Sequence, residues 1–587
     1  MKTLGWIIKI ITMIVMFAVL ELNKNSLFGW FLTFVCTGLC FFVSAKINGF
    51  KNVLVYFIWV AVFVLILFFS WPKERYVPAV KGKDPLKTQI YETAYGKVQG
   101  VFNKEGTVEV FAGIPYAKPP IEDLRWKKPQ KADPWDDILL ADHFMAMAMQ
   151  EKDLPIYSSI ARIVGYHDYV PELGDEYDLK ASEDCLYLNI WRPSKPEGKV
   201  PVLVYIHGGS LKSGQTWYRD FNGEGLAKEG IIVVNFAYRL GVFGFYANEE
   251  LANESTEHTT GNYGLLDMVE ALKWVKENIS AFGGDENNIT IAGESAGSAA
   301  VSALCTSPLA KGLFDKAVLE SSTVAAKIPT HSYRSYEDAL SSGKELMERY
   351  DASSVEDLRK IPAEDLVKEA EAQHHMTVDG YVLTEDPYQS YKKGIHNESA
   401  ILHGYNSEES GPFILFSHAN MKNFEERIRR YFGDHADAVL KIYDTKDDKE
   451  ADEYWAEIYG CIYFSYPHYC LNRLAVENDI PVYQYFFDRN NGYLSSWHSG
   501  EEIYFYHNIP KGSVFDQRDK ELSDEMASAL LSFVRTSDPN HEGLISWPMN
   551  SDSKTMMGFG DTTRIVTERS LALYEILDEM QGFENKK

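Results

Sequence analysis

The chain has 587 residues, of which 45% are hydrophobic, 13% aromatic and 24% charged. This mixture is typical of a globular protein and not of a long disordered chain. The formal net charge is -26 at pH 7, and such an acidic surface repels phosphate backbones, so nucleic acid is excluded as an expected partner. The six cysteines contain no pair of CxxC units, so we expect no structural metal.

Three long apolar segments lie in residues 1–72. They cover residues 6–20, 28–45 and 53–71, and only Lys9, in the first of them, carries a charge. A membrane-spanning helix needs about 20 mostly apolar residues, so we expect a transmembrane region of about three helices, with Lys9 reaching toward the headgroups. A cleaved signal peptide is the alternative for the first segment, but no small-x-small cleavage site follows it.

The next part of the chain, residues 73–88, is polar and contains prolines and lysines, which predicts a linker between the membrane region and a globular domain at 89–587. The sequence therefore indicates a membrane protein. Lysines and arginines flank the apolar segments on both sides, so the positive-inside rule favours neither orientation of the globular domain.

Strand and helix patterns alternate in the globular domain. Residues 200–206 and 231–237 are continuous apolar runs rich in β-branched residues, residues 265–279 have helical spacing, and a further strand ends at Gly293. This alternation predicts an α/β fold with a mainly parallel central sheet and helices on both faces. Reactive residues in such folds lie on loops at the carboxyl ends of the strands.

One such loop, residues 293–297, reads Gly-Glu-Ser-Ala-Gly and is followed by a helical segment. G-x-S-x-G between a strand and a helix predicts a nucleophile elbow, in which Ser295 is lifted above the sheet at the positive end of the helix. Strand and helix converge there, so the residues two before and two after the serine must lack side chains. A plain strand–helix turn is the alternative, but it would not need both glycines.

A second glycine-containing loop, His207-Gly208-Gly209-Ser210, follows the strand at 200–206. An HGGG-type loop in this place presents backbone N–H groups to the oxyanion of a tetrahedral intermediate. We therefore expect an oxyanion hole made of the amides of Gly209, Ser210 and Ala296. An ordinary glycine turn is the alternative.

Further motifs occur in a fixed order along the globular domain. They are FAGIPYA at 111–117, EDCLYLNI at 183–190, YRLG at 238–241, GNYGLLD at 261–267 and FGGD at 282–285. With the two loops above, they resemble the type B carboxylesterase family, which includes cholinesterases and bacterial carboxylesterases, from about residue 90 to the C-terminus. The resemblance implies the α/β-hydrolase fold and a serine carboxylic-ester hydrolase.

The resemblance also implies the other two residues of the catalytic triad, because the family order is serine, an acid that is usually glutamate, and histidine. The acid matches Glu409, in the loop after a predicted strand at 399–405, with Glu408 as the fallback. The histidine matches His498, in the loop after a predicted strand at 482–487, with His507 as the competitor.

The implied mechanism uses His498 as the base and passes through an acyl-enzyme, and it needs neither a metal nor an organic cofactor. A typical histidine base predicts that activity is lost in acid with a midpoint of about 6 to 7. We expect small-molecule esters as substrates, neutral and lipophilic or aromatic, with lipophilic ones delivered from the bilayer.

Two departures from the family pattern refine these expectations. Alanine at position 148 replaces a cysteine that often pairs with the one at Cys185, so we expect a free buried thiol there, as in bacterial members. Residues 174–182 lack the choline-stacking tryptophan of cholinesterases, which disfavours acetylcholine as a substrate. Two alternatives stay open: an inactive cholinesterase-like binding or adhesion protein, and an amide or thioester hydrolase that uses the same triad.

Overall fold

The computed structural model describes residues 2–82, 84–152, 154–165, 177–326, 333–493, 495–510 and 514–583. Lys83 of the predicted linker and residues 174–176 of the segment without a tryptophan lie outside the described residues. The chain forms two compact units, Met1–Val77 with Glu151–Lys180, and Pro78–Gln150 with Ala181–Lys587. It therefore passes from one unit to the other three times.

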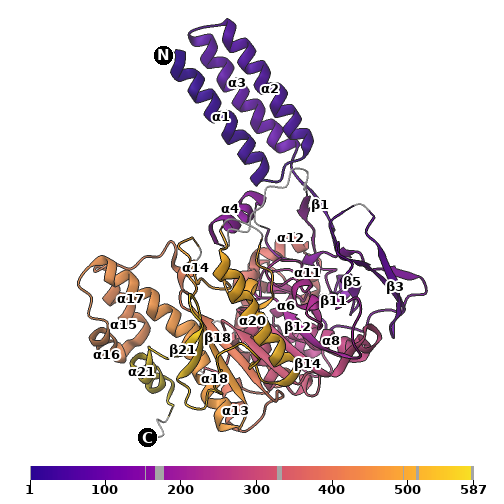
Figure 1. Cartoon of the computed structure of the whole chain (residues 1–587), viewed down its shortest axis with the longest axis vertical. Helices are drawn as coiled ribbons and strands as arrows, with labels where there is room; N and C mark the ends of the chain where they lie inside the picture. Colours follow the sequence, from indigo (N-terminus) through magenta and orange to yellow (C-terminus); the bar gives the residue numbers. More distant parts are fainter. Residues whose placement is uncertain are drawn as a thin grey trace. The chain divides into compact units, whose positions relative to one another are not determined.

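The first unit contains the three apolar helices α1 (Lys2–Leu22), α2 (Leu27–Lys46) and α3 (Phe50–Phe69), which lie side by side (Figure 1). Each is long and apolar enough to cross a membrane. The three predicted helices are thus present, but Lys9 differs from the expectation. Its ammonium group is buried and donates a hydrogen bond to Asn52 Oδ1 at 2.6 Å, because α3 offers a polar partner within the bundle.

The rest of the first unit comes from two separate stretches of the chain. Residues 73–75 form β1 (Lys73–Arg75), which pairs in parallel with β9 (Tyr177–Leu179). The helix α4 (Pro155–Gly165) belongs to the same unit, and Ser159 Oγ donates to the carbonyl of Leu22 at the end of α1, at 2.8 Å. The first residues of the predicted linker 73–88 therefore form a strand, because they find backbone partners in β9.

The second unit is built on a mixed sheet that has thirteen strands among the described residues. In sheet order the strands are β21 (Arg564–Thr567), β20 (Thr555–Phe559), β19 (Val482–Phe487), β18 (Ile401–Asn406), β15 (Lys316–Glu320), β14 (Gly284–Glu294), β12 (Val200–Ile206), β13 (Ile232–Phe236), β11 (Tyr187–Pro193), β5 (Val108–Pro115), β4 (Lys97–Phe102) and β3 (Lys87–Glu92), with β6 (Ile138–Leu140) beside β4. The strands from β20 to β13 run parallel, and the others pair antiparallel except β6.

Helices cover both faces of this sheet, as the sequence predicts. The helices α8 (Tyr263–Asn278) and α9 (Ala296–Thr306) pack on each other and on β14. The helix α20 (Gln517–Thr536) packs on β12 and β14 (Figure 1). Every residue of β13 and β15 is buried, which is expected of parallel strands covered on both sides. The predicted α/β fold is confirmed.

The remaining elements connect or flank these layers. The other α-helices are α5 (Glu224–Lys228), α6 (Gly241–Phe245), α7 (Glu249–Glu254), α10 (Tyr336–Arg349), α11 (Val355–Arg359), α12 (Ala363–Leu366), α13 (Pro387–Lys392), α14 (Gly411–Ile414), α15 (Phe424–Phe432), α16 (Ala436–Ile442), α17 (Asp448–Gly460), α18 (Tyr466–Glu477), α19 (Glu502–Phe505) and α21 (Leu571–Gln581). The short strands are β2 (Val77–Pro78), β7 (His143–Phe144), β8 (Met147–Ala148), β10 (Ala181–Ser182), β16 (Tyr333–Ser335) and β17 (Met376–Val378).

Candidate active site

The predicted elbow lies at the carboxyl end of β14, directly before α9. Ser295 has φ 55° and ψ -125°, a strained backbone conformation for a residue with a side chain. A Cβ atom on Gly293 would lie 2.6 Å from the carbonyl carbon of Gly297, and one on Gly297 would lie 2.0 Å from the carbonyl oxygen of Ile206. Both distances are far below van der Waals contact, so the crossing of strand and helix needs both glycines.

The predicted serine, histidine and glutamate lie in one hydrogen-bonded chain. His498 Nε2 is 2.8 Å from Ser295 Oγ, and His498 Nδ1 is 2.6 Å from Glu409 Oε2. The other carboxylate oxygen of Glu409 accepts the backbone N–H of Asn406 at 2.7 Å. The three residues follow the parallel strands β14, β18 and β19, so the topology of the sheet brings them to the same edge.

The two competing residues lie elsewhere. Glu408 is exposed and accepts a hydrogen bond from Ser495 Oγ. The backbone of Glu408 pairs with that of Trp497, so its side chain points away from the side chain of Glu409. His507 Nε2 is 2.8 Å from Asp524 Oδ1 in an exposed pair. The structure thus brings Glu409, and not Glu408, to the histidine.

The glycine loop after β12 passes directly beside Ser295. A Cβ atom on Gly208 would lie 3.1 Å from Ser295 Cβ. The next glycine, Gly209, has φ 99°, and a Cβ atom there would lie 2.2 Å from a backbone oxygen. Within the described residues, the amides of Gly209, Ser210 and Ala296 donate to no protein acceptor, so they are available to a substrate oxygen.

His207 anchors the start of the glycine loop 207–210. Its ring stacks on Tyr238 at 4.5 Å between centroids, and the Tyr238 hydroxyl donates to the carbonyl of His207 at 2.8 Å. Burial lowers the pKa of His207 to about 4, so the ring is neutral at physiological pH. A neutral, stacked ring fixes the start of the loop without adding charge beside the serine.

Glu294, the variable residue of the serine motif, is the neighbour that the sequence did not single out. Its Oε1 lies 3.2 Å from His498 Nε2 and accepts a hydrogen bond from Ser499 Oγ at 2.6 Å. Burial by itself lowers the pKa of His498, but the carboxylates of Glu294 and Glu409 raise it more. Burial also raises the pKa of Glu294. If His498 is the base, the acid limb of the activity profile, which is the fall of activity toward low pH, is therefore expected at a higher pH than the pKa of an unperturbed histidine.

Further buried carboxyl groups hold the loop that carries the histidine. Glu501 accepts hydrogen bonds from Ser321 Oγ at 2.6 Å and from the Tyr485 hydroxyl at 3.1 Å. Glu502 accepts one from the Tyr205 hydroxyl. Burial raises the pKa of both carboxyl groups. The sequence signal for them is the acidic pair just after the histidine, before a buried aromatic run.

Aromatic rings form a wall beside the histidine. The Phe464 and Phe413 rings lie 4.9 Å and 5.1 Å from the His498 ring between centroids, and Tyr459 extends the wall at 6.1 Å from Phe413. Phe464 is buried, whereas Phe413 is 43% exposed. The wall therefore presents an accessible apolar surface next to the His498 ring.

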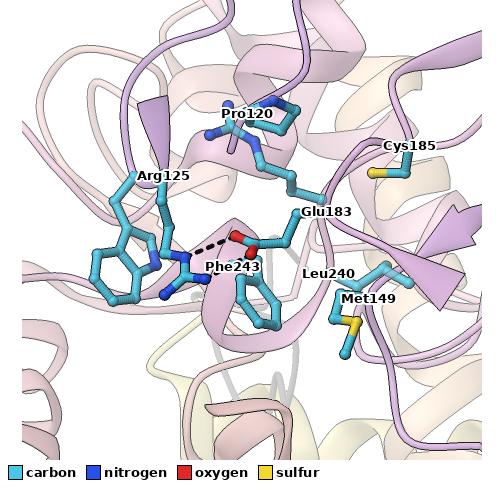
Figure 2. Close-up of a pocket in the computed structure, with 9 residues that line it drawn as sticks. Pro120, Arg125, Met149, Glu183, Cys185, Leu240 and Phe243 are labelled. Carbon is cyan, nitrogen blue, oxygen red and sulfur yellow. Dashed lines mark hydrogen bonds and ion pairs between the residues drawn. The ribbon is translucent and has the colours of Figure 1, made fainter. Parts of the chain in front are cut away.

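A small pocket elsewhere in the catalytic unit contains paired charges (Figure 2). Arg125 donates from Nε and Nη2 to the two carboxylate oxygens of Glu183 at 2.7 and 2.6 Å. Cys185 lines the same pocket as a free buried thiol, as predicted, and burial raises its pKa well above the usual value. Its lining does not include Ser295, Glu409 or His498, so we interpret it as a structural ion-pair site.

Comparison with known proteins agrees with the geometry. Residues 87–573 match the model of the carboxylesterase family. The chain belongs to this family. The esterase is 31% identical over 496 residues to the fumonisin B1 esterase of Sphingopyxis macrogoltabida, covering 80% of this chain and 86% of that protein. It is 32% identical over 487 residues to the para-nitrobenzyl esterase of Bacillus subtilis (strain 168), covering 78% and 92%.

Its fold is also that of solved carboxylesterases. The structure of the Geobacillus stearothermophilus carboxylesterase superposes with a TM-score of 0.70 at 30% identity, covering 84% of this chain and 100% of that chain. The protein is therefore an α/β-hydrolase-fold enzyme, a serine carboxylic-ester hydrolase, and the predictions of fold, family and enzyme class are confirmed.

Proposed function

We propose that Ser295, His498 and Glu409 are the catalytic triad of this esterase, with an oxyanion hole formed by the amides of Gly209, Ser210 and Ala296. The observation that carries the proposal is the continuous chain of hydrogen bonds, 2.8 Å from serine to histidine and 2.6 Å from histidine to glutamate. A base within hydrogen-bond reach of the nucleophile, itself oriented by a third group, is the arrangement that activates a serine.

The reaction proceeds in two steps. Neutral His498 accepts the proton of Ser295 Oγ as that oxygen attacks the ester carbonyl, and the same proton passes to the alcohol as it leaves. Water then attacks the acyl-enzyme, gives a proton to His498, and the acid departs as the serine regains its proton. Glu409 keeps the imidazole in the required tautomer and stabilises its cation.

The favoured substrates are neutral esters with a lipophilic or aromatic group. The wall of Phe413, Phe464 and Tyr459 supports this proposal, because apolar and aromatic groups gain by leaving water next to such a surface. The net charge of -26 disfavours anionic substrates. The name of the para-nitrobenzyl esterase relative also points to an aromatic alcohol.

The esterase acts at a membrane. The support is the length and apolarity of α1, α2 and α3, with mean hydropathies of 2.2, 1.9 and 2.7 in their candidate spans. In this proposal residues 1–72 span the bilayer, residues 73–88 link them to the globular domain, and residues 89–587 form the catalytic domain. Extraction of membranes with alkaline carbonate tests it, because a spanning protein stays in the pellet and a peripheral one is released.

The triad is tested by hydrolysis of a short-chain p-nitrophenyl ester by the full chain in detergent, with fluorophosphonate labelling. Ser295→Ala is expected to lose labelling and to lower the rate by about 10⁴-fold or more. The matched control is Ser302→Ala, two turns along the same helix, where the hydroxyl contacts Thr323 at 2.8 Å. Labelling that survives Ser295→Ala would refute the assignment, and a comparison of matched ester and amide substrates separates esterase from amidase activity.

A further inference from the structure

The helix α4 presents apolar side chains to solvent. Leu154, directly before the helix, is 47% exposed, and Tyr157, Ile160 and Ile163 are 61%, 42% and 39% exposed. With 100° of rotation per residue, these positions occupy one half of the helix surface. Ser158 and Ser159 lie on the other half. An exposed apolar face of this kind on a short helix needs a partner other than water.

The position of α4 within the first unit identifies that partner. Ser159 Oγ, on the polar half, is buried and donates to the carbonyl of Leu22 at 2.8 Å. That carbonyl is among the last four of α1, which lack partners inside the helix. The helix α4 is thus docked at the end of a proposed span, where the hydrocarbon region gives way to headgroups.

Aromatic residues gather at the same end of the helix bundle. Trp71 follows the end of α3 and is 36% exposed, and Tyr76 lies shortly after it and is 37% exposed. Tryptophan and tyrosine prefer the boundary between hydrocarbon and water, where a ring is buried and its polar atom stays hydrated. Tyr157 of α4 adds a third such ring, so the apolar face and the aromatic residues share one boundary layer.

We propose that α4 lies in the bilayer interface, with Tyr157, Ile160 and Ile163 inserted among the upper acyl chains. This proposal rests on the membrane assignment made above. Amphipathic helices of this kind bury their apolar face by about 5–10 Å into the boundary between headgroups and acyl chains. The helix α4 is then a membrane-binding element in its own right, separate from the three spans.

The test measures the depth of single labelled positions in the full chain, reconstituted into phosphatidylcholine vesicles. The six native cysteines, all free, are first replaced by alanine so that each variant carries one thiol. In that background, Ile160→Cys and, as the matched control on the opposite half, Ser158→Cys are labelled with a nitrobenzoxadiazole dye. Phe34→Cys, at a 70% exposed site in the middle of α2, reports insertion of the spans. Lipids with a nitroxide near the headgroup or deep in the acyl chain then quench the dye according to its depth.

We expect the dye at position 160 to emit at shorter wavelength than at position 158, and to be quenched several-fold more by the shallow nitroxide. A water-like emission at both positions, with position 34 quenched by the deep nitroxide, would overturn the proposal while leaving the spans intact. A blue-shifted dye at position 160 that no lipid quenches would assign the face to a protein contact and also overturn it. A dye at position 34 that is not quenched would overturn the membrane assignment, and this proposal with it.

Discussion

Replacing Glu294 by glutamine tests the electrostatics of the active site most directly. The substitution keeps the shape of the side chain and an oxygen that can accept the Ser499 hydrogen bond, but it removes the charge 3.2 Å from His498 Nε2. In the proposed mechanism His498 must be neutral to accept the serine proton, so activity should rise as the pH passes upward through the pKa of His498. Since Glu294 raises that pKa, its removal moves the acid limb to lower pH.

The size of the effect follows from Coulomb's law. Two full charges at 3.2 Å interact by about 5 kcal/mol at an effective dielectric constant of about 20, which corresponds to about 4 pKa units. Burial raises the pKa of Glu294, so part of the attraction between the two charges is offset by the cost of keeping the buried Glu294 carboxyl group charged. We therefore expect a net downward shift of about 1 to 2 pH units in the acid limb.

The assay is the pH dependence of kcat/KM for a neutral p-nitrophenyl ester, which reports the pKa of the free enzyme. Glu294→Asp is the matched control, because it keeps the charge and should keep the limb near its wild-type position. An acid limb that stays in place in Glu294→Gln, with measurable activity, would refute the coupling between Glu294 and the histidine.

Two further substitutions test the packing behind the site and the ion pair in the pocket. Gly297→Ala places a Cβ atom 2.0 Å from the carbonyl oxygen of Ile206. We therefore expect it to lose hydrolysis and to lower the free energy of unfolding by about 1–3 kcal/mol or more. The control Gly460→Ala, whose Cβ atom would have no contact closer than 3.9 Å, should behave like wild type in the same assays. Glu183→Gln leaves the buried charge of Arg125 without its partner and should lower the free energy of unfolding by about 3 kcal/mol. Denaturant unfolding in detergent measures this free energy. A loss no larger than that of Glu286→Gln, which breaks an exposed ion pair, would contradict the prediction.

The sequence predicted the fold because the fold depends on local patterns, and the same patterns indicate which loops carry the proposed site. Apolar runs define the strands, and the steric need for glycine at positions 293 and 297 identifies the elbow. The strand at 482–487 has the predicted bounds, whereas β14 begins at Gly284, before the apolar run, because pairing with β12 extends the strand into a polar stretch.

Other parts of the site depend on contacts between distant segments, which one sequence does not show. Glu294 and His498 are about two hundred residues apart, and only the fold places their atoms 3.2 Å from each other. The choice of Glu409 over Glu408 depends on the pairing of the loop with Trp497. The strand β1 forms in the predicted linker because β9, about a hundred residues later, supplies its backbone partners.

The chain connects the two units at three points, and this determines how many cuts by a protease would release the catalytic unit. A protease that cuts only within residues 78–88 severs one of the three connections. The described elements α4 and β9 still hold the catalytic chain to residues 2–77 through the Ser159–Leu22 hydrogen bond and the β1–β9 ladder. With the proposed spans in the bilayer, such a cut should leave a nicked but membrane-retained enzyme. Release into solution would then require two further cleavages, one before α4 and one after β9.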